Sequence, residues 1–139
     1  GGESVEYITR RLVILASEDI GNANPNALNL ATSTMLATSK IGYPESKIIL
    51  SQCVIYLASC PKSNSSYNAI NQALNYITNS EVLEIPIHLQ DSHIGYKYPH
   101  DFGGYVEQDY LYKNVQFYST KNIGYEKTLN DWSAKIKTI

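Results

Sequence analysis

The stretch Val5-Glu-Tyr-Ile-Thr-Arg-Arg-Leu-Val-Ile-Leu-Ala-Ser-Glu-Asp-Ile20 decides the fold at the start of the chain. Residues three or four positions apart lie on one face of a helix. That spacing is met by Val5, Ile8, Leu12 and Leu15. The unbroken run 12–16 adds apolar side chains outside this face. Gly21 follows and can take the left-handed conformation that ends many helices. The stretch therefore predicts a helix that is buried on more than one side.

Three more segments with helical periodicity follow before residue 80, separated by short breaks. The breaks are marked by Asn24, Pro25 and Gly42 around the second segment, Pro44 and Pro61 around the third, and Ser63 or Asn64 at the start of the fourth. The expected inner faces are Leu28, Ala31, Met35 and Thr38, then Ile49, Cys53, Tyr56, Leu57 and Cys60, then Tyr67, Ile70, Leu74 and Ile77. Short connections between antiparallel neighbours predict an all-α, four-helix bundle over residues 1–80.

The pattern changes over residues 81–121, which follow neither the helical nor the strand period. The stretch Gly95-Tyr-Lys-Tyr-Pro-His-Asp-Phe-Gly-Gly-Tyr105 is rich in turn formers and aromatics, and seven of the 12 tyrosines lie between Tyr96 and Tyr125. Because disordered segments are poor in aromatics, we expect an ordered, irregular strap whose tyrosines pack against the bundle. A final helix over 122–139 would present Tyr125, Leu129, Trp132, Ile136 and Ile139 on one face.

The composition is that of one globular domain, with 139 residues, 43% of them apolar and 17% charged. A net charge of −2 gives no global attraction to nucleic acid. Cys53 and Cys60 would be separated by about 10 Å of helical rise, too far for a disulfide, so we expect buried thiols in a reducing cytoplasm. No apolar run of about 18 residues and no signal peptide are present. The opening Gly1-Gly2-Glu3 suggests a fragment boundary or a tag remnant.

The sequence gives little support for catalysis or for ligand binding. It contains no Gly-x-x-x-x-Gly-Lys-Ser/Thr motif, so we do not expect ATP to bind to this chain. A metal site built from His88, Asp91, His93, His100 and Asp101 would have irregular ligand spacing. A triad of Ser63, Ser65 or Ser66 with His100 and Asp101 lacks a nucleophile elbow, and nothing near Cys60 would lower its thiol pKa. We therefore predict no catalytic, cofactor or metal site.

Contacts with DNA or a partner protein have a small set of candidates: Arg10, Arg11, Lys62, Tyr96, Lys97 and Tyr98. Lys62 would lie at the start of the fourth helix, where backbone amides can add to a phosphate site. The two tyrosines beside Lys97 could stack on bases. The alternative is that they anchor the strap. Glu18 and Asp19 lie at a helix end that disfavours negative charge, so they either pair with arginines or remain solvated.

Several long strings together resemble one family. They are Arg10-Arg-Leu-Val-Ile-Leu-Ala-Ser-Glu-Asp-Ile-Gly-Asn-Ala-Asn-Pro25, Pro61-Lys-Ser-Asn-Ser-Ser-Tyr-Asn-Ala69, Gly95-Tyr-Lys-Tyr-Pro-His-Asp-Phe-Gly-Gly-Tyr-Val106 and Gly124-Tyr-Glu-Lys127. In this order they resemble the C-terminal region of the replication-associated recombination protein A family, which includes Werner-helicase-interacting homologues. The resemblance gives Glu18, Asp19, Asn68, Pro99, His100 and Asp101 a structural role in these motifs.

The resemblance implies an AAA+ ATPase, related to clamp-loader subunits, that acts at replication forks in recombination and repair. This region would be its oligomerisation collar, holding the subunits together as a tetramer. ATP and Mg²⁺ would belong to the ATPase domain, which is absent from this chain. DNA and single-strand binding protein would be partners of the parent protein, in the cytoplasm at the bacterial nucleoid. Between Leu89 and Gly95 many members carry a longer segment, whereas this chain has only Gln90-Asp-Ser-His-Ile94.

Overall fold

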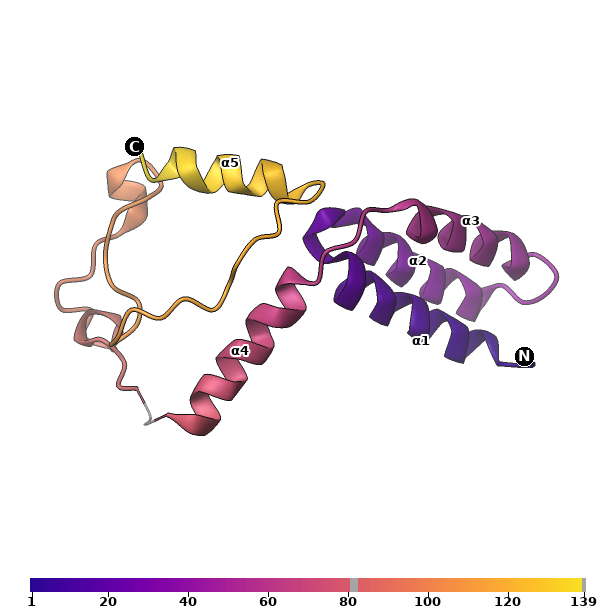
Figure 1. The fold of residues 1–139 in the computed structure, drawn as a ribbon, viewed down its shortest axis with the longest axis horizontal. Helices are drawn as coiled ribbons and strands as arrows, with labels where there is room; N and C mark the ends of the chain where they lie inside the picture. The colour runs from indigo at the N-terminus through magenta and orange to yellow at the C-terminus, as the bar shows by residue number, and fades with distance from the viewer. Residues whose placement is uncertain (81–82, 139) are drawn as a thin grey trace.

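The computed structural model describes residues 1–80 and 83–138. Within them the fold is all-helical, as predicted, and contains no strand (Figure 1). The α-helices are α1 (Val5–Leu15), α2 (Asn26–Lys40), α3 (Ser46–Ser59), α4 (Ser65–Asn79) and α5 (Glu126–Ile136). Across the described ranges, no helix has the length and apolar character needed to cross a membrane.

The core lies among α1, α2 and α3, which run up, down and up with α2 in the middle (Figure 1). The buried stripe of α2 is Ala27, Ala31, Thr34 and Thr38, so small side chains let its two neighbours approach closely. The expected stripe on α2 was wrong at Leu28, which is exposed. On α3, Cys53, Leu57 and Cys60 are buried as predicted, and both cysteines are free thiols. Ala16 and Ile20 complete the core.

The connection from α1 to α2 is a widened turn rather than a simple helix end. Residues Ala16–Ile20 form a π-helical turn, followed by a 3₁₀ turn over Gly21–Ala23. The helix ends at Gly21, as predicted, where φ is +52° and an added Cβ would approach the Ser63 carbonyl oxygen to 3.0 Å. The π turn buries Ile20 completely, whereas Asp19 faces solvent.

The start of α2 shows how Asn24 acts. Its side-chain oxygen accepts a 3.2 Å hydrogen bond from the backbone amide of Asn26, the first residue of α2. The side-chain nitrogen of Asn24, Nδ2, also donates a 2.9 Å hydrogen bond to the Tyr56 hydroxyl. The N-cap of α2 is therefore Pro25, one residue later than predicted, and the Asn24 side chain joins the start of α2 to α3.

The expected four-helix bundle is corrected to a three-helix bundle with α4 leading away from it (Figure 1). α4 contacts the π and 3₁₀ turns that precede α2. Its one buried residue is Ser65, in the first turn. The periodicity of Tyr67, Ile70, Leu74 and Ile77 is helical as predicted, but this face is exposed instead of buried in the bundle. Periodicity shows that a face is apolar without showing what covers it.

The strap is ordered mainly by contacts within itself, which corrects the expected packing of its tyrosines on the bundle. Gln108 accepts from the Lys97 amide at 3.1 Å and donates to the Lys97 carbonyl at 2.7 Å, and the His88 ring contacts the Asp109 carbonyl. Phe117 packs edge-on against Tyr76 of α4, with ring centroids 5.6 Å apart. Most strap tyrosines are exposed: Tyr96, Tyr98, Tyr110, Tyr112 and Tyr118. Short 3₁₀ turns occur at Ile87–Leu89 and Pro99–Phe102.

Candidate functional site

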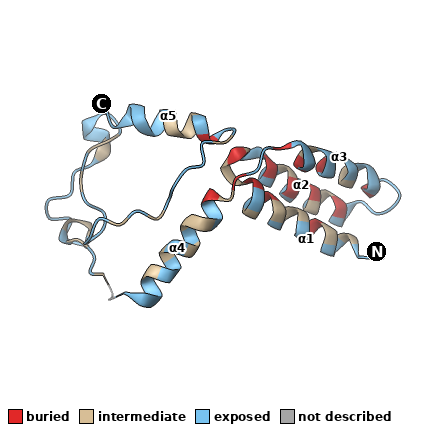
Figure 2. Ribbon diagram, in the orientation of Figure 1, coloured by how far each residue is buried: buried red, intermediate tan, exposed pale blue. Residues whose placement is uncertain are grey.

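The most conspicuous surface feature is the apolar face of α4, which we call the α4 stripe: Tyr67, Ile70, Leu74 and Ile77. These side chains are between 43% and 69% exposed. Figure 2 shows how little of α4 is buried beyond its first turn. Burying a large apolar side chain is worth about 1.5–3 kcal/mol relative to leaving it in water. Contiguous exposed apolar stripes of this kind are typical of interaction surfaces.

An open groove of about 630 Å³ lies between α4 and α5. Ile70 of the α4 stripe and Leu129 of α5 both line it, with Tyr118 of the strap. The predicted apolar face of α5 is confirmed from Tyr125 to Ile136, and Tyr125 meets Trp132 edge-on at 5.8 Å between ring centroids. Ile139, the last residue predicted for that face, lies outside the described residues. Two helices thus turn apolar side chains toward the same groove.

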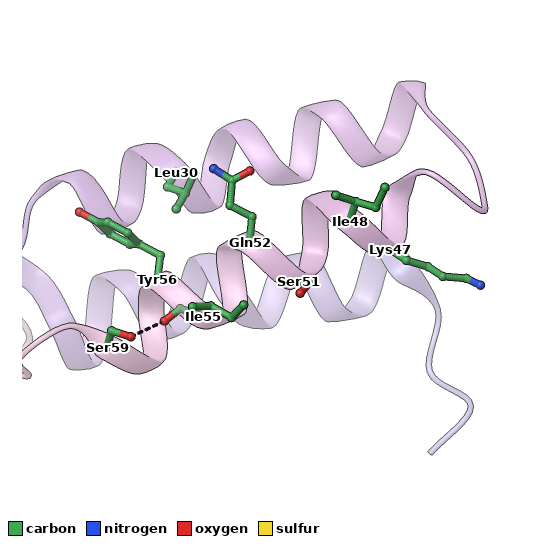
Figure 3. A pocket seen from close by; sticks show the side chains of 8 residues that line it. All are labelled: Leu30, Lys47, Ile48, Ser51, Gln52, Ile55, Tyr56 and Ser59. Carbon is green, nitrogen blue, oxygen red and sulfur yellow. Dashed lines mark hydrogen bonds between the residues drawn. The ribbon is translucent and has the colours of Figure 1, made fainter.

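A second open groove, of about 750 Å³, runs along the outer side of the bundle between α2 and α3. Figure 3 shows its lining, in which Ile48 and Ile55 come from α3 and Leu30 from α2. Ile48 and Ile55 are 72% and 64% exposed. The hydrophobic surface of the described chain therefore continues outside the α4–α5 region.

One buried carboxylate holds α5 onto the rest of the molecule. Glu126, the first residue of α5, is fully buried. Its Oε1 accepts hydrogen bonds of 2.5 Å from each of the Ser63 and Ser65 hydroxyls. Its Oε2 accepts from the backbone amides of Lys121 at 3.1 Å and Ile123 at 3.2 Å. The carboxylate thus connects the start of α4, the end of the strap and α5.

The protonation of Glu126 follows from these partners. Burial raises the pKa of its carboxyl group, because it disfavours the charged form. The hydroxyls of Ser63 and Ser65 and the amides of Ile123 and Lys121 all stabilise the charged form, and together they outweigh burial. The pKa of Glu126 is therefore held below its ordinary value, and the group is a carboxylate at neutral pH.

The loop before α5 is fitted closely to the bundle at Gly124. The Tyr125 amide donates a 2.9 Å hydrogen bond to the Ala23 carbonyl. At Gly124 φ is +58°, and an added Cβ would lie 2.4 Å from the Ala23 oxygen and 3.1 Å from a Pro61 side-chain carbon. Only glycine fits this approach without a shift of the backbone. We call Glu126, Gly124, Ser63 and Ser65 with these contacts the α5 junction.

The residues proposed from sequence as DNA or partner contacts are not brought together. Arg10 forms a 2.7 Å ion pair with Glu6 on the exposed surface of α1, and Arg11 is exposed beside it. Lys97 lies in the strap, a segment that is drawn mostly at the end of the molecule opposite to α1 (Figure 1). Its neighbours are exposed: Tyr96 lies against the His93 ring and Tyr98 against the His100 ring. No single basic surface is formed by this set.

Lys62 has a structural role that sequence reasoning did not foresee. Its ammonium group donates to the Leu57 carbonyl at 3.0 Å and to the Cys60 carbonyl. These are carbonyls at the end of α3, where a positive charge interacts favourably with the helix dipole. The amine is therefore directed to the end of α3 instead of the start of α4.

The motif residues are placed as parts of turns. Asn68 donates a 3.2 Å hydrogen bond to the Asn64 side chain in the first turn of α4. Pro99, His100 and Asp101 form the second 3₁₀ turn of the strap, with the Asp101 amide bound to the Tyr98 carbonyl. In the portion of the chain that the structure describes, Glu18 and Asp19 make no ion pair, and no group of three potential metal ligands occurs.

Comparison with known proteins now decides the family. Residues 1–137 match the family model described as MgsA AAA+ ATPase C terminal. The chain belongs to this family. It is 40% identical to replication-associated recombination protein A of Bacillus subtilis over 134 residues, which cover 86% of this chain and 32% of that protein. Identity is 38% to the protein of the same name from Coxiella burnetii, covering 81% of this chain and 24% of that protein.

The match extends to a eukaryotic relative, ATPase WRNIP1 of Dictyostelium discoideum, at 34% identity over 83% of this chain and 15% of that protein. The chain thus spans about a third or less of each of these relatives. The resemblance to this family seen in the sequence is confirmed. Glu126 lies in the string Gly124-Tyr-Glu-Lys127 that carried part of that resemblance, which was the one available signal for the α5 junction.

Proposed function

We propose that this region is the self-assembly domain of an AAA+ ATPase that acts in replication-associated recombination. The observation that carries the proposal is the α4 stripe, an amphipathic helix whose apolar face is exposed along its whole length. The groove shared with α5 adds a second apolar wall. A closed homo-oligomer would reuse this surface on every subunit, and we propose a tetramer.

The parent protein would hold ATP and Mg²⁺ in an ATPase domain that precedes this region in the family. Two relatives carry the name replication-associated recombination protein A, and we propose that the parent protein acts in the same process. We propose that DNA and single-strand binding protein are partners of that longer protein at the bacterial nucleoid. The motivation is family membership, together with the absence of a phosphate-binding loop from residues 1–139.

Light scattering coupled to gel filtration tests the proposal directly. We expect residues 1–139 to elute with a molar mass about four times the 15.5 kDa of one chain. The double substitution Leu74→Ser and Ile77→Ser should reduce that mass to the monomer value, because it removes two exposed apolar side chains of the stripe. Asn75→Ser, an exposed polar change on the same helix, is the matched control. A wild-type chain that remains monomeric up to high concentration would contradict the proposal.

A second candidate function is nucleic-acid contact by the strap. The observation that favours it is the consecutive exposure of Tyr96, Lys97 and Tyr98, two aromatic rings flanking a cation. Fluorescence anisotropy with a labelled single-stranded oligonucleotide tests it. Binding should weaken as salt rises and weaken further on Lys97→Ala, whereas Lys113→Ala, an exposed change elsewhere in the strap, should have a smaller effect. No binding at low salt would exclude this function for the region.

A further inference from the structure

The end of the bundle farthest from α4 carries exposed apolar side chains that the proposed self-assembly surface does not use. α2 ends there, α3 begins there, and the loop between them lies at the tip (Figure 1). We call this set the bundle tip: Leu36, Ile41, Tyr43 and Ile48. They are between 44% and 72% exposed. The ammonium group of Lys47 lies 5.7 Å from the centre of the Tyr43 ring, so the tip also has a cationic edge.

The chain enters the bundle at this same end. Val5 and Glu6, in the first turn of α1, line one groove together with Leu36 and Ser39 from the last turns of α2. Residues 1–4 are exposed and precede the helix. Figure 1 shows the N-terminus at the same end of the bundle as the α2–α3 loop. Any domain that precedes residue 1 is therefore connected to the molecule beside the bundle tip.

The family defines what that preceding domain is. The matching family model is the C-terminal part of AAA+ ATPases, and the matched region is 32% of the Bacillus subtilis relative. The ATPase domain therefore lies upstream of this region. The connection from that domain therefore enters the bundle at the end that carries the tip.

We infer that the bundle tip is the docking surface for the ATPase domain of the same chain. This inference rests on the proposed function, because it requires the region to be joined to an ATPase. The apolar side chains of the tip would be covered by that domain, while the α4 stripe at the other end of the bundle remains for other subunits. Assembly and attachment of the ATPase domain thus use opposite ends of α1–α3 (Figure 1).

Hydrogen exchange measured by mass spectrometry tests the inference on two proteins, residues 1–139 and the full-length natural protein. Amides of residues 36–48 should exchange at least about tenfold more slowly in the full-length protein, a factor that corresponds to about 1.4 kcal/mol. Equal exchange in the two proteins would overturn the inference. The proposed function would still hold if the α4 amides are protected from exchange in both proteins. The proposed function would instead be refuted if both proteins are monomeric and their α4 amides exchange freely.

Substitutions in the full-length protein give a second, independent readout. Ile48→Ser with Tyr43→Ser should remove the added protection and speed protease cleavage near residues 1–4 severalfold, with the oligomeric mass unchanged. Ile55→Ser is the matched control, since Ile55 is 64% exposed against 72% for Ile48 and lies on the same helix, two turns farther from the tip. If the control has the same effect, or if the pair changes the oligomeric mass instead, the tip is not the docking surface. Melting of the same variants in residues 1–139 verifies that they fold.

Discussion

The Ser63 hydroxyl donates a 2.5 Å hydrogen bond to the Glu126 carboxylate, although the two residues lie 63 positions apart in the sequence. Ser65 and the Lys121 and Ile123 amides donate to the same carboxylate. Both carboxylate oxygens therefore act as acceptors, one for the two serine hydroxyls and the other for the two backbone amides. This set of bonds makes α5 a defined wall of the groove beside α4 instead of a free appendage.

Replacing Glu126 with glutamine should destabilise the fold. The glutamine amide has one acceptor oxygen and no charge, so either the two serine hydroxyls or the two backbone amides lose their charged acceptor. We expect the free energy of unfolding to fall by about 1–3 kcal/mol, measured by urea denaturation. Glu107→Gln is the matched control, because Glu107 is exposed and accepts from the Tyr105 hydroxyl. An unchanged midpoint for Glu126→Gln would contradict the role of the junction.

The same carboxylate should make stability depend on pH. Its pKa in the folded state lies below the ordinary value of 4.5, so the unfolded chain binds its proton more readily. The stabilisation is therefore fully present above pH 4.5 and is lost as the pH falls through the lower pKa of the folded state. We expect the difference in unfolding free energy between wild type and Glu126→Gln to shrink over this acidic range. If this difference in unfolding free energy grew as the pH fell, the pKa of Glu126 would be raised by folding and not lowered.

Gly124→Ala should separate α5 from the bundle. The new Cβ would lie 2.4 Å from the Ala23 carbonyl oxygen, at a φ of +58° that alanine rarely adopts. We expect a loss of more than about 1 kcal/mol of stability, together with faster hydrogen exchange at the Tyr125 amide. Gly42→Ala is the control, because an added Cβ there meets no atom within 4 Å. Equal effects of the two substitutions would argue against close packing at Gly124.

Lys62→Ala should affect the end of α3. The change removes the ammonium group that donates to the Leu57 and Cys60 carbonyls. We expect a loss of about 0.5–1.5 kcal/mol in thermal unfolding, with Lys113→Ala, an exposed lysine of the strap, close to wild type. If the fold is unaffected but DNA affinity falls, Lys62 contacts phosphate as first expected from the sequence.

The helices themselves could be predicted because their signals are local. Proline at positions 25, 44 and 61 and glycine at position 21 mark boundaries through backbone geometry alone. The buried face of α3 followed from the spacing of Cys53, Leu57 and Cys60. The π turn over Ala16–Ile20 could not be predicted, since it depends on how Ile20 fits the core formed with α2 and α3.

The sequence by itself determined the family, the helical class and the apolar faces, since each depends on residues that are close together along the chain. Tertiary structure alone decided which of those faces is covered. The same periodicity led to burial in α3 and to exposure in α4, because burial depends on a neighbouring surface that spacing does not specify. The α5 junction also depends on tertiary structure. Nothing in the sequence distinguishes Glu126 from other carboxylates, and only folding brings Ser63 and Ser65 to it. Their hydrogen bonds are strong because the carboxylate is shielded from solvent.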